Sequence, residues 1–146
     1  MRSHFIPAGA AGTRSTLAAM VAISLNASPH IDVVMDPRTL DSFLRDNWNF
    51  VEDGANEFIR DPLKNGRMVG DCDDAAVWVG ALLYAYRKRN NVLSHAFFVA
   101  VRPPNESDFQ HVFTIAEDKH GTFRIDPTAP ADANYKGWEE MRHPLF

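Results

Sequence analysis

The longest apolar segment of the chain is 75–86 (AAVWVGALLYAY), which contains no charged residue. A segment of this length without a polar face predicts a helix that is buried on all sides. We expect this helix to begin near Cys72 and to continue to about Arg89. The cations Arg87-Lys88-Arg89 suit the dipole at its C-terminal end, and the two asparagines that follow are expected to end it.

A first helix is expected from about Thr13 to Asn26, with one face formed by Leu17, Met20, Val21 and Ser24. Residues 14–27 can also be interpreted as a signal peptide, because a short apolar stretch follows arginines and precedes Leu25-Asn26-Ala27. We favour a helix of the domain, since the apolar stretch is brief and interrupted by a serine. Residues 1–12, rich in Gly, Ala and Pro, predict an extended N-terminal arm.

The pattern changes from helices to strands along the chain. Asp36-Pro37 is typical of a helix start, and apolar positions continue that helix to about Trp48. Three later segments rich in β-branched and aromatic residues predict strands: 95–102, 110–116 and 122–126. Residues 129–146 show no regular pattern. Helices followed by an antiparallel sheet indicate an α+β fold, in one domain over residues 13–146.

Composition narrows the classes of function. The chain has 146 residues, 45% of them hydrophobic, which is typical of one globular domain. Its net charge of −4, without a basic cluster, argues against nucleic-acid binding, and its apolar stretches are too short to span a membrane. The single cysteine excludes an intramolecular disulfide, and the scattered histidines show no metal-ligand spacing, so we expect no metal.

That cysteine, Cys72, stands at the expected start of the apolar helix, where free N–H groups and the helix dipole favour a thiolate. His111 and Asp126 follow downstream, and the three residue types together form a thiol-based catalytic triad. Asp71 is the expected N-cap, while Asp73 and Asp74 lie in the first turn, where their charges suit the dipole but oppose a thiolate.

The triad requires a particular hairpin register. If the turn between the last two predicted strands is centred between Lys119 and His120, Asp126 faces Phe113 and lies diagonal to His111. Diagonal neighbours are roughly 7–8 Å apart at the backbone, within reach of their side chains. A slip of one residue would put the two on opposite faces. Phe113 and Ile115 share the face of His111, and we expect that face to pack on the cysteine helix.

The sequence Gly70-Asp71-Cys72-Asp73-Asp74, then His111, then Asp126-Pro127-Thr128, resembles the transglutaminase-like superfamily. The resemblance covers roughly 50–128, and its lead-in is similar to members encoded in bacteriophage genomes. It implies a papain-like fold and a catalytic triad of Cys72, His111 and Asp126. It also implies thiol acyl transfer on an amide of a protein or peptide, by hydrolysis or crosslinking, without a cofactor.

The roles in such a triad follow from the residue types. The Cys72 thiolate attacks a carbonyl carbon, His111 takes and returns the proton, and Asp126 orients the imidazole. Backbone N–H groups at the helix start are expected to stabilise the oxyanion. In animal transglutaminases a tryptophan assists there, and Trp48 is its candidate counterpart in this chain.

Two other functions stay open. The chain could be a non-catalytic bacteriophage virion protein, docking on other virion proteins through its N-terminal arm and its aromatic C-terminal tail. It could also be a periplasmic cysteine peptidase, which requires the signal-peptide interpretation of residues 14–27. We favour the bacterial cytoplasm or the phage virion over export.

Overall fold

The computed structural model describes residues 9–32, 34–51, 59–62 and 68–146. In chain order the elements are α1 (Gly9–Ala27), the 3₁₀ helices η1 (Ser28–His30) and η2 (Pro37–Thr39), α2 (Leu40–Asn47), β1 (Asn49–Phe50), β2 (Val69–Gly70), α4 (Cys72–Arg89), β3 (His95–Arg102), β4 (His111–Asp118), β5 (Gly121–Ile125) and β6 (Glu139–Pro144). The fold is therefore α+β, as predicted. Within the described ranges, none of the helices combines the length and apolar character that crossing a bilayer requires.

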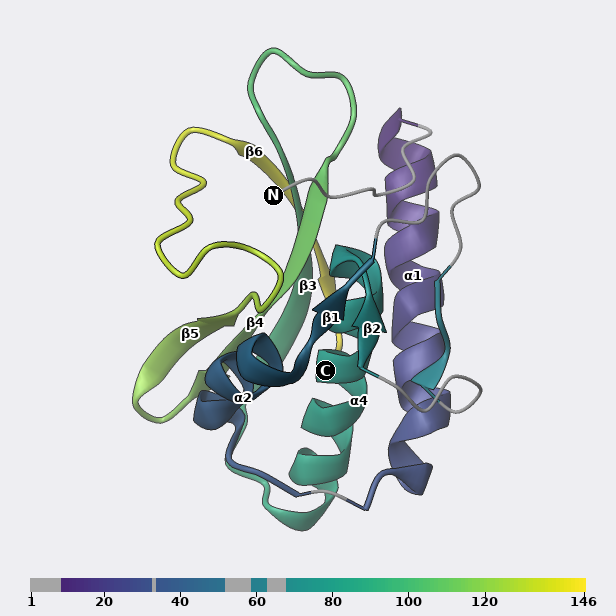
Figure 1. The fold of residues 1–146 in the computed structure, drawn as a ribbon, viewed down its shortest axis with the longest axis vertical. Helices are drawn as coiled ribbons and strands as arrows, with labels where there is room; N and C mark the ends of the chain where they lie inside the picture. Colours follow the sequence, from purple (N-terminus) through teal and green to yellow (C-terminus); the bar gives the residue numbers. More distant parts are fainter. Residues whose placement is uncertain (1–8, 33, 52–58, 63–67) are drawn as a thin grey trace.

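The main sheet is antiparallel and has the strand order β5-β4-β3-β6 (Figure 1). β1 and β2 form a separate parallel pair that leads directly into α4. The three predicted strands are confirmed, with bounds that differ by at most two residues. β6 was not predicted: it pairs along the free edge of β3, with Arg102 opposite Glu139 and Phe97 opposite Pro144.

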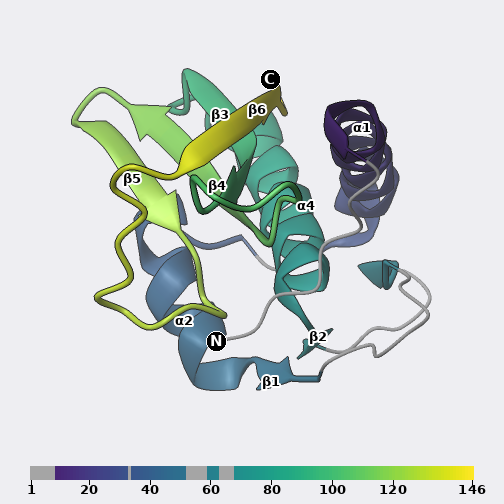
Figure 2. The same cartoon turned by 90° about the horizontal axis from the view of Figure 1, so that it is seen from above.

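Helix α4 lies between α1 and the sheet, so the domain has three layers (Figure 2). This position explains why its sequence has no polar face. α1 buries Leu17, Met20 and Ser24 against it, and the Ser24 hydroxyl donates to the Val77 carbonyl at 2.9 Å. Gly80 permits the close approach, because a Cβ there would lie 2.6 Å from Ser24 Oγ. Residues 14–27 are thus part of a packed helix, which supports the domain-helix interpretation.

The N-terminal part of the chain differs from the prediction in one respect. α1 begins at Gly9 rather than near Thr13, so residues 9–12 are helical instead of extended. The alanines of this segment favour helix, which outweighs its glycines once α1 is docked. The rest of the predicted arm, residues 1–8, lies outside the described residues, as do 52–58 and 63–67 of the segment that precedes α4.

The face of β4 that carries His111 is not the face that packs on α4. Val112 and Ala116 belong to the main core with the side chains of α4, whereas Phe113 packs in a second cluster, with Ile115 at its border. The prediction that Phe113 and Ile115 pack on the cysteine helix is therefore wrong. Both faces of β4 are apolar, so alternation alone does not show which face a helix covers.

Candidate active site

The turn between β2 and α4 requires glycine at position 70. Gly70 has φ +135°, and a Cβ there would lie 2.1 Å from Asp74 Oδ2. That carboxylate occupies the space because it accepts a hydrogen bond from the Asp71 N–H at 3.0 Å. The bond satisfies a donor at the start of α4 and fixes the backbone that presents Cys72, which is 1% exposed.

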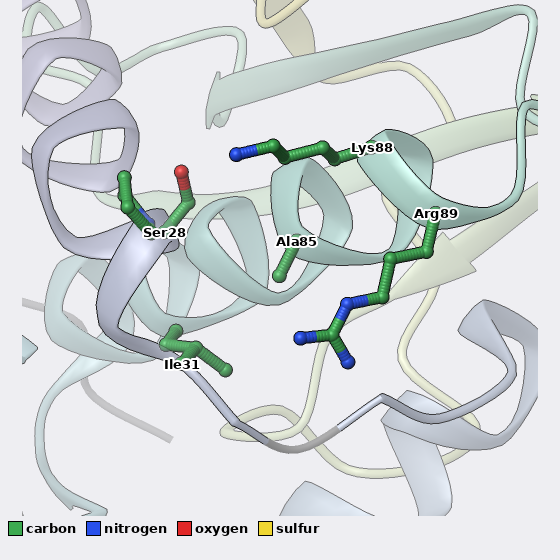
Figure 3. A pocket seen from close by; sticks show the side chains of 6 residues that line it. Ser28, Ile31, Ala85, Lys88 and Arg89 are labelled. Carbon is green, nitrogen blue, oxygen red and sulfur yellow. The ribbon is translucent and has the colours of Figure 1, made fainter.

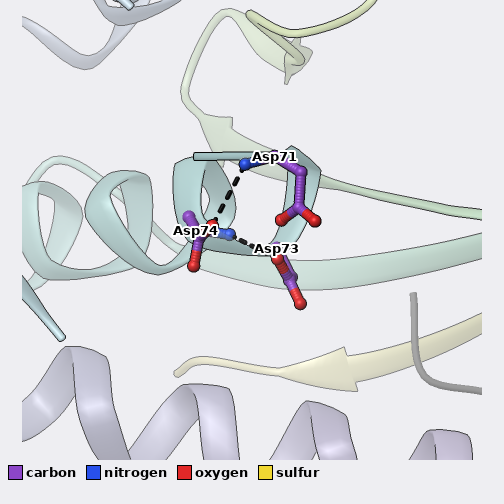
Figure 4. Close-up of side chains that lie close together, drawn as sticks. All are labelled: Asp71, Asp73 and Asp74. Atoms are coloured by element: carbon purple, nitrogen blue, oxygen red, sulfur yellow. Dashed lines mark hydrogen bonds between the residues drawn. The ribbon is translucent and has the colours of Figure 1, made fainter. Parts of the chain in front are cut away.

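Three buried carboxylates surround this helix start (Figure 4). Asp73 accepts from the Asp74 N–H at 2.8 Å. Asp74 also accepts from Arg60, whose backbone N–H lies 2.6 Å from Oδ1 and whose guanidinium lies 2.6 Å from Oδ2. Burial raises the pKa of Asp74 to about 7, the charge of Asp71 adds to the rise, and the Arg60 hydrogen bonds only partly offset it. This carboxyl therefore carries little charge below neutral pH, which weakens its repulsion of a thiolate at Cys72.

Carboxylates this close together can hold a hard cation, and oxygens of Asp71, Asp73 and Asp74 lie within 4.8 Å of one another. Asp73 and Asp74 are already occupied by the contacts above, with backbone N–H groups and with Arg60. The cluster is explained as the capping structure of α4, where negative groups suit the dipole.

His111 and Asp126 form a buried pair. His111 Nε2 lies 2.7 Å from Asp126 Oδ1, and the two side chains are 1% and 2% exposed. The β4–β5 register is the one predicted: Thr114 pairs with Ile125 and Asp118 with Gly121, so continuing the ladder places Asp126 opposite Phe113. The pairing of these two predicted catalytic residues is therefore confirmed.

Helix α2 holds the backbone at Asp126 in place. The Asp126 N–H donates to Asp41 Oδ1 at 2.6 Å, and its carbonyl accepts from Arg45 at 2.9 Å. Arg45 also donates to the Ala129 carbonyl and to Asp41, one helical turn away. Asp41 and Arg45 thus satisfy both backbone groups of Asp126 where it leaves the sheet. The sequence contains them as an i, i+4 pair, but their partner 81–85 residues away was not predictable.

Tyr135 is a further member of the site. Its phenol donates to Asp126 Oδ2 at 2.8 Å, and its ring stacks on Phe113 with centroids 5.1 Å apart. Burial raises its pKa well above the usual value, and the charge of Asp126 and the hydrogen bond to it add to the rise. The phenol therefore remains a hydrogen-bond donor throughout the physiological pH range. Sequence analysis did not assign it a role, because it lies in an irregular tail.

Cys72 lies within electrostatic range of Tyr135, which is bonded to this pair. A negative charge on Cys72 would raise the pKa of the Tyr135 phenol, which itself bonds Asp126 and lies beside the His111 ring, with centroids 5.6 Å apart. Among the described residues, His111 Nδ1 is buried without a hydrogen-bond partner, so no thiol–imidazole hydrogen bond is formed. Such contacts are often longer in free enzymes than in their complexes.

The expected oxyanion donors are partly occupied. The Asp74 N–H bonds the Asp73 carboxylate, and the Ala75 N–H bonds the Asp71 carbonyl at 3.1 Å. Trp48 donates its indole N–H to the Gly70 carbonyl at 3.0 Å. It therefore supports the turn before Cys72, and the bond occupies the donor that an oxyanion would need.

Two surface hollows lie at the far end of α4. One, of about 270 Å³, is lined by Ser28 and Ile31 and by Ala85, Lys88 and Arg89 of α4 (Figure 3). Ala85 is roughly 20 Å from Cys72 along the helix, given a rise of about 1.5 Å per residue. A second hollow nearby is lined by Tyr84 and Arg87. Neither is a cleft for the chemistry of Cys72.

Comparisons with protein-family models, with curated proteins and with solved structures returned no match. The chemistry of the site therefore has to be inferred from its own residues.

Proposed function

We propose that the chain is a transglutaminase-like cysteine hydrolase or acyltransferase with a papain-like fold, in which Cys72, His111 and Asp126 act as a catalytic triad. One observation carries the proposal: the buried His111 Nε2–Asp126 Oδ1 contact of 2.7 Å at the β4–β5 register that the triad requires. The contact fixes the imidazole and leaves its Nδ1 as the base for a thiol.

The reaction proceeds in two steps. The proton of Cys72 passes to His111 Nδ1, and the thiolate attacks the carbonyl carbon of an amide, forming a C–S bond. The C–N bond then breaks, and His111 returns the proton to the departing amine. Water attacks the thioester with His111 as base, releasing the carboxylic acid and restoring the thiol. An amine in place of water would give a crosslink. Bacterial and phage members of the transglutaminase-like superfamily, which this sequence resembles, favour hydrolysis.

The first test is the alkylation rate of Cys72 by iodoacetamide across pH, in the wild type and in His111→Ala. Burial slows alkylation at every pH, so the shape of the profile is the readout. A histidine-paired thiolate stays reactive well below ~7, whereas an ordinary thiol follows a pKa near ~8.5. The ultraviolet absorbance of the thiolate, compared with Cys72→Ser, gives the same profile without requiring access to the sulfur.

His120→Ala is the matched control, because His120 lies exposed in the β4–β5 turn, away from Asp126. We expect His111→Ala to shift the profile to that of an ordinary thiol and His120→Ala to leave it unchanged. An ordinary profile in the wild type would contradict the proposal.

A second candidate is a non-catalytic virion component that uses the same fold for assembly. It is favoured by the burial of the site, since Cys72, His111 and Asp126 are each at most 2% exposed. Its proposed docking through the aromatic tail has less support, because Tyr135 and Trp138 pack on each other and Phe146 packs on Tyr84. Assembly that survives Cys72→Ser but fails without residues 1–8 would favour this function.

A further inference from the structure

The irregular segment between β5 and β6 returns to the site and places Tyr135 beside the catalytic pair. The ring is held from two sides: it stacks on Phe113 at an interplanar angle of 12°, and Trp138 meets it edge-on with centroids 5.3 Å apart. The Trp138 N–H also donates to the Tyr135 carbonyl at 3.0 Å, closing a turn. The phenol is therefore positioned by packing before it makes any hydrogen bond.

The two oxygens of the Asp126 carboxylate have different partners. Oδ1 lies 2.7 Å from His111 Nε2, and Oδ2 accepts from the Tyr135 phenol at 2.8 Å. A carboxylate held at one oxygen can rotate about its terminal torsion, which is broad for aspartate. A second bond to the other oxygen fixes that rotation, and it satisfies an oxygen that burial separates from water.

We propose that Tyr135 is a positioning residue of the active site, which acts through Asp126 by fixing the carboxylate in the orientation that bonds His111. The consequence of this inference for catalysis rests on the proposed function. The hydrogen bond from Tyr135 to Asp126 and its effect on His111 do not depend on turnover. The phenol takes no part in proton transfer, since it stays protonated at the pH where a thiolate–imidazolium pair operates.

Tyr135→Phe removes the phenol oxygen and keeps the ring that stacks on Phe113. Tyr84→Phe is the matched control: Tyr84 also donates a partly buried phenol, at 2.5 Å to the Leu145 carbonyl, in the C-terminal half of α4 away from the pair. Each variant loses one phenol hydrogen bond, so a general loss of stability should be similar in the two.

Two readouts follow the inference. The first is the midpoint of the His111 imidazole titration, measured by NMR; we expect Tyr135→Phe to lower it partway toward the value of Asp126→Asn. The second is the rate of Cys72 alkylation near pH 6, expected to fall about threefold to tenfold, as for the loss of one hydrogen bond. Tyr84→Phe should change neither. In an Asp126→Asn background Tyr135→Phe should add no further effect, because its target is absent.

An unchanged His111 midpoint in Tyr135→Phe, or a shift in the opposite direction, would overturn the inference. If Tyr135→Phe is not folded, the wild type decides: the phenol proton should give a slowly exchanging resonance with a contact to the Asp126 region, and its absence would also overturn it. An ordinary alkylation profile in the wild type would contradict the triad. The His111 midpoint then still decides the role of Tyr135, so the two failures are distinguishable.

Discussion

The two ends of α4 carry opposite charges in opposite environments. At the N-terminal end three carboxylates are fully buried around Cys72, and at the C-terminal end Lys88 and Arg89 are exposed to solvent. Both arrangements match the helix dipole, so the sequence pattern alone treats them as equivalent. The structure separates them: burial raises the pKa of Asp74 at the N-terminal end, whereas water screens the C-terminal charges. Charge has chemical consequences at one end and little effect at the other.

The largest effect is expected at the turn before Cys72. Gly70→Ala should destabilise the fold by about 4 kcal/mol, because the new Cβ displaces a buried carboxylate that pairs with Arg60. Gly121→Ala is the control: Gly121 has φ +115°, but no atom lies within 4 Å of its Cβ position. It should cost about 1 kcal/mol for the backbone strain alone. Urea denaturation of both variants measures the difference, and equal losses would show that the close approach at Gly70 is relieved cheaply.

The next effect concerns Asp74. Its pKa in the folded state, about 7, lies above the ordinary value of 3.8. The stabilising contribution of this carboxyl to the fold is therefore fully present below about pH 4 and is lost as pH rises through 7. The free energy of unfolding should fall by the order of 3 kcal/mol over this range relative to Asp74→Asn.

The contribution of Asp118 to stability depends on pH in the opposite direction to that of Asp74. The Arg38 guanidinium, 2.8 Å away, holds the pKa of that partly buried carboxyl below its usual range, so its stabilising contribution to the fold is present at neutral pH and lost in acid. Asp118→Asn should therefore flatten the acid limb of the stability profile, and Asp74→Asn the limb between pH 4 and 7. Denaturation series across pH would show both limbs of the stability profile. Equal slopes between pH 4 and 7 for the wild type and Asp74→Asn would contradict the raised pKa of Asp74.

A smaller effect is expected from the contact of α2 with the site. Arg45→Met keeps the aliphatic stem and removes the donors to the Asp126 and Ala129 carbonyls, which should cost about 2 kcal/mol. It should also move the Cys72 alkylation profile toward that of an ordinary thiol. Arg38→Met removes a guanidinium that binds Asp118 at the β4–β5 turn instead of Asp126, and it should cost less and leave that profile unchanged. An alkylation profile moved equally by both would mean that α2 does not hold Asp126 specifically.

The smallest effect belongs to the C-terminal end of α4. Arg89→Ala should change the free energy of unfolding by no more than about 0.5 kcal/mol, because its charge is exposed and its interaction with the dipole is screened. Thermal unfolding at low and high salt checks this value. A loss comparable to that of Arg45→Met would show that the exposed end contributes more than its environment indicates.

Local patterns predicted what depends on neighbours in sequence. The uncharged segment after Cys72 predicted the buried helix, and the turn around Lys119 and His120 predicted the register that pairs His111 with Asp126. Each follows from spacing within one or two elements, where periodicity and turn geometry are decisive.

What the sequence did not predict depends on distant pairing. β6 (EEMRHP) is mostly charged and polar, so it lacks the apolar alternation of a predicted strand. It is ordered by pairing with β3, and charges on an edge strand oppose pairing of its free edge with another chain. With β6 undetected, Tyr135 had no assigned position. The face of β4 that α4 covers was also not decidable, since Val112 and Phe113 offer apolar surfaces on opposite sides.

The strand order has a consequence for the chain while it is being made. β3 lies inside the sheet, but its second neighbour, β6, is synthesised only after β4, β5 and the segment that carries Tyr135. At the usual rate of translation this delay is on the order of seconds. During that interval the apolar edge of β3 (HAFFVAVR) has no partner in its own chain and can pair with another one. The last strand therefore closes an edge that is otherwise open to pairing between chains.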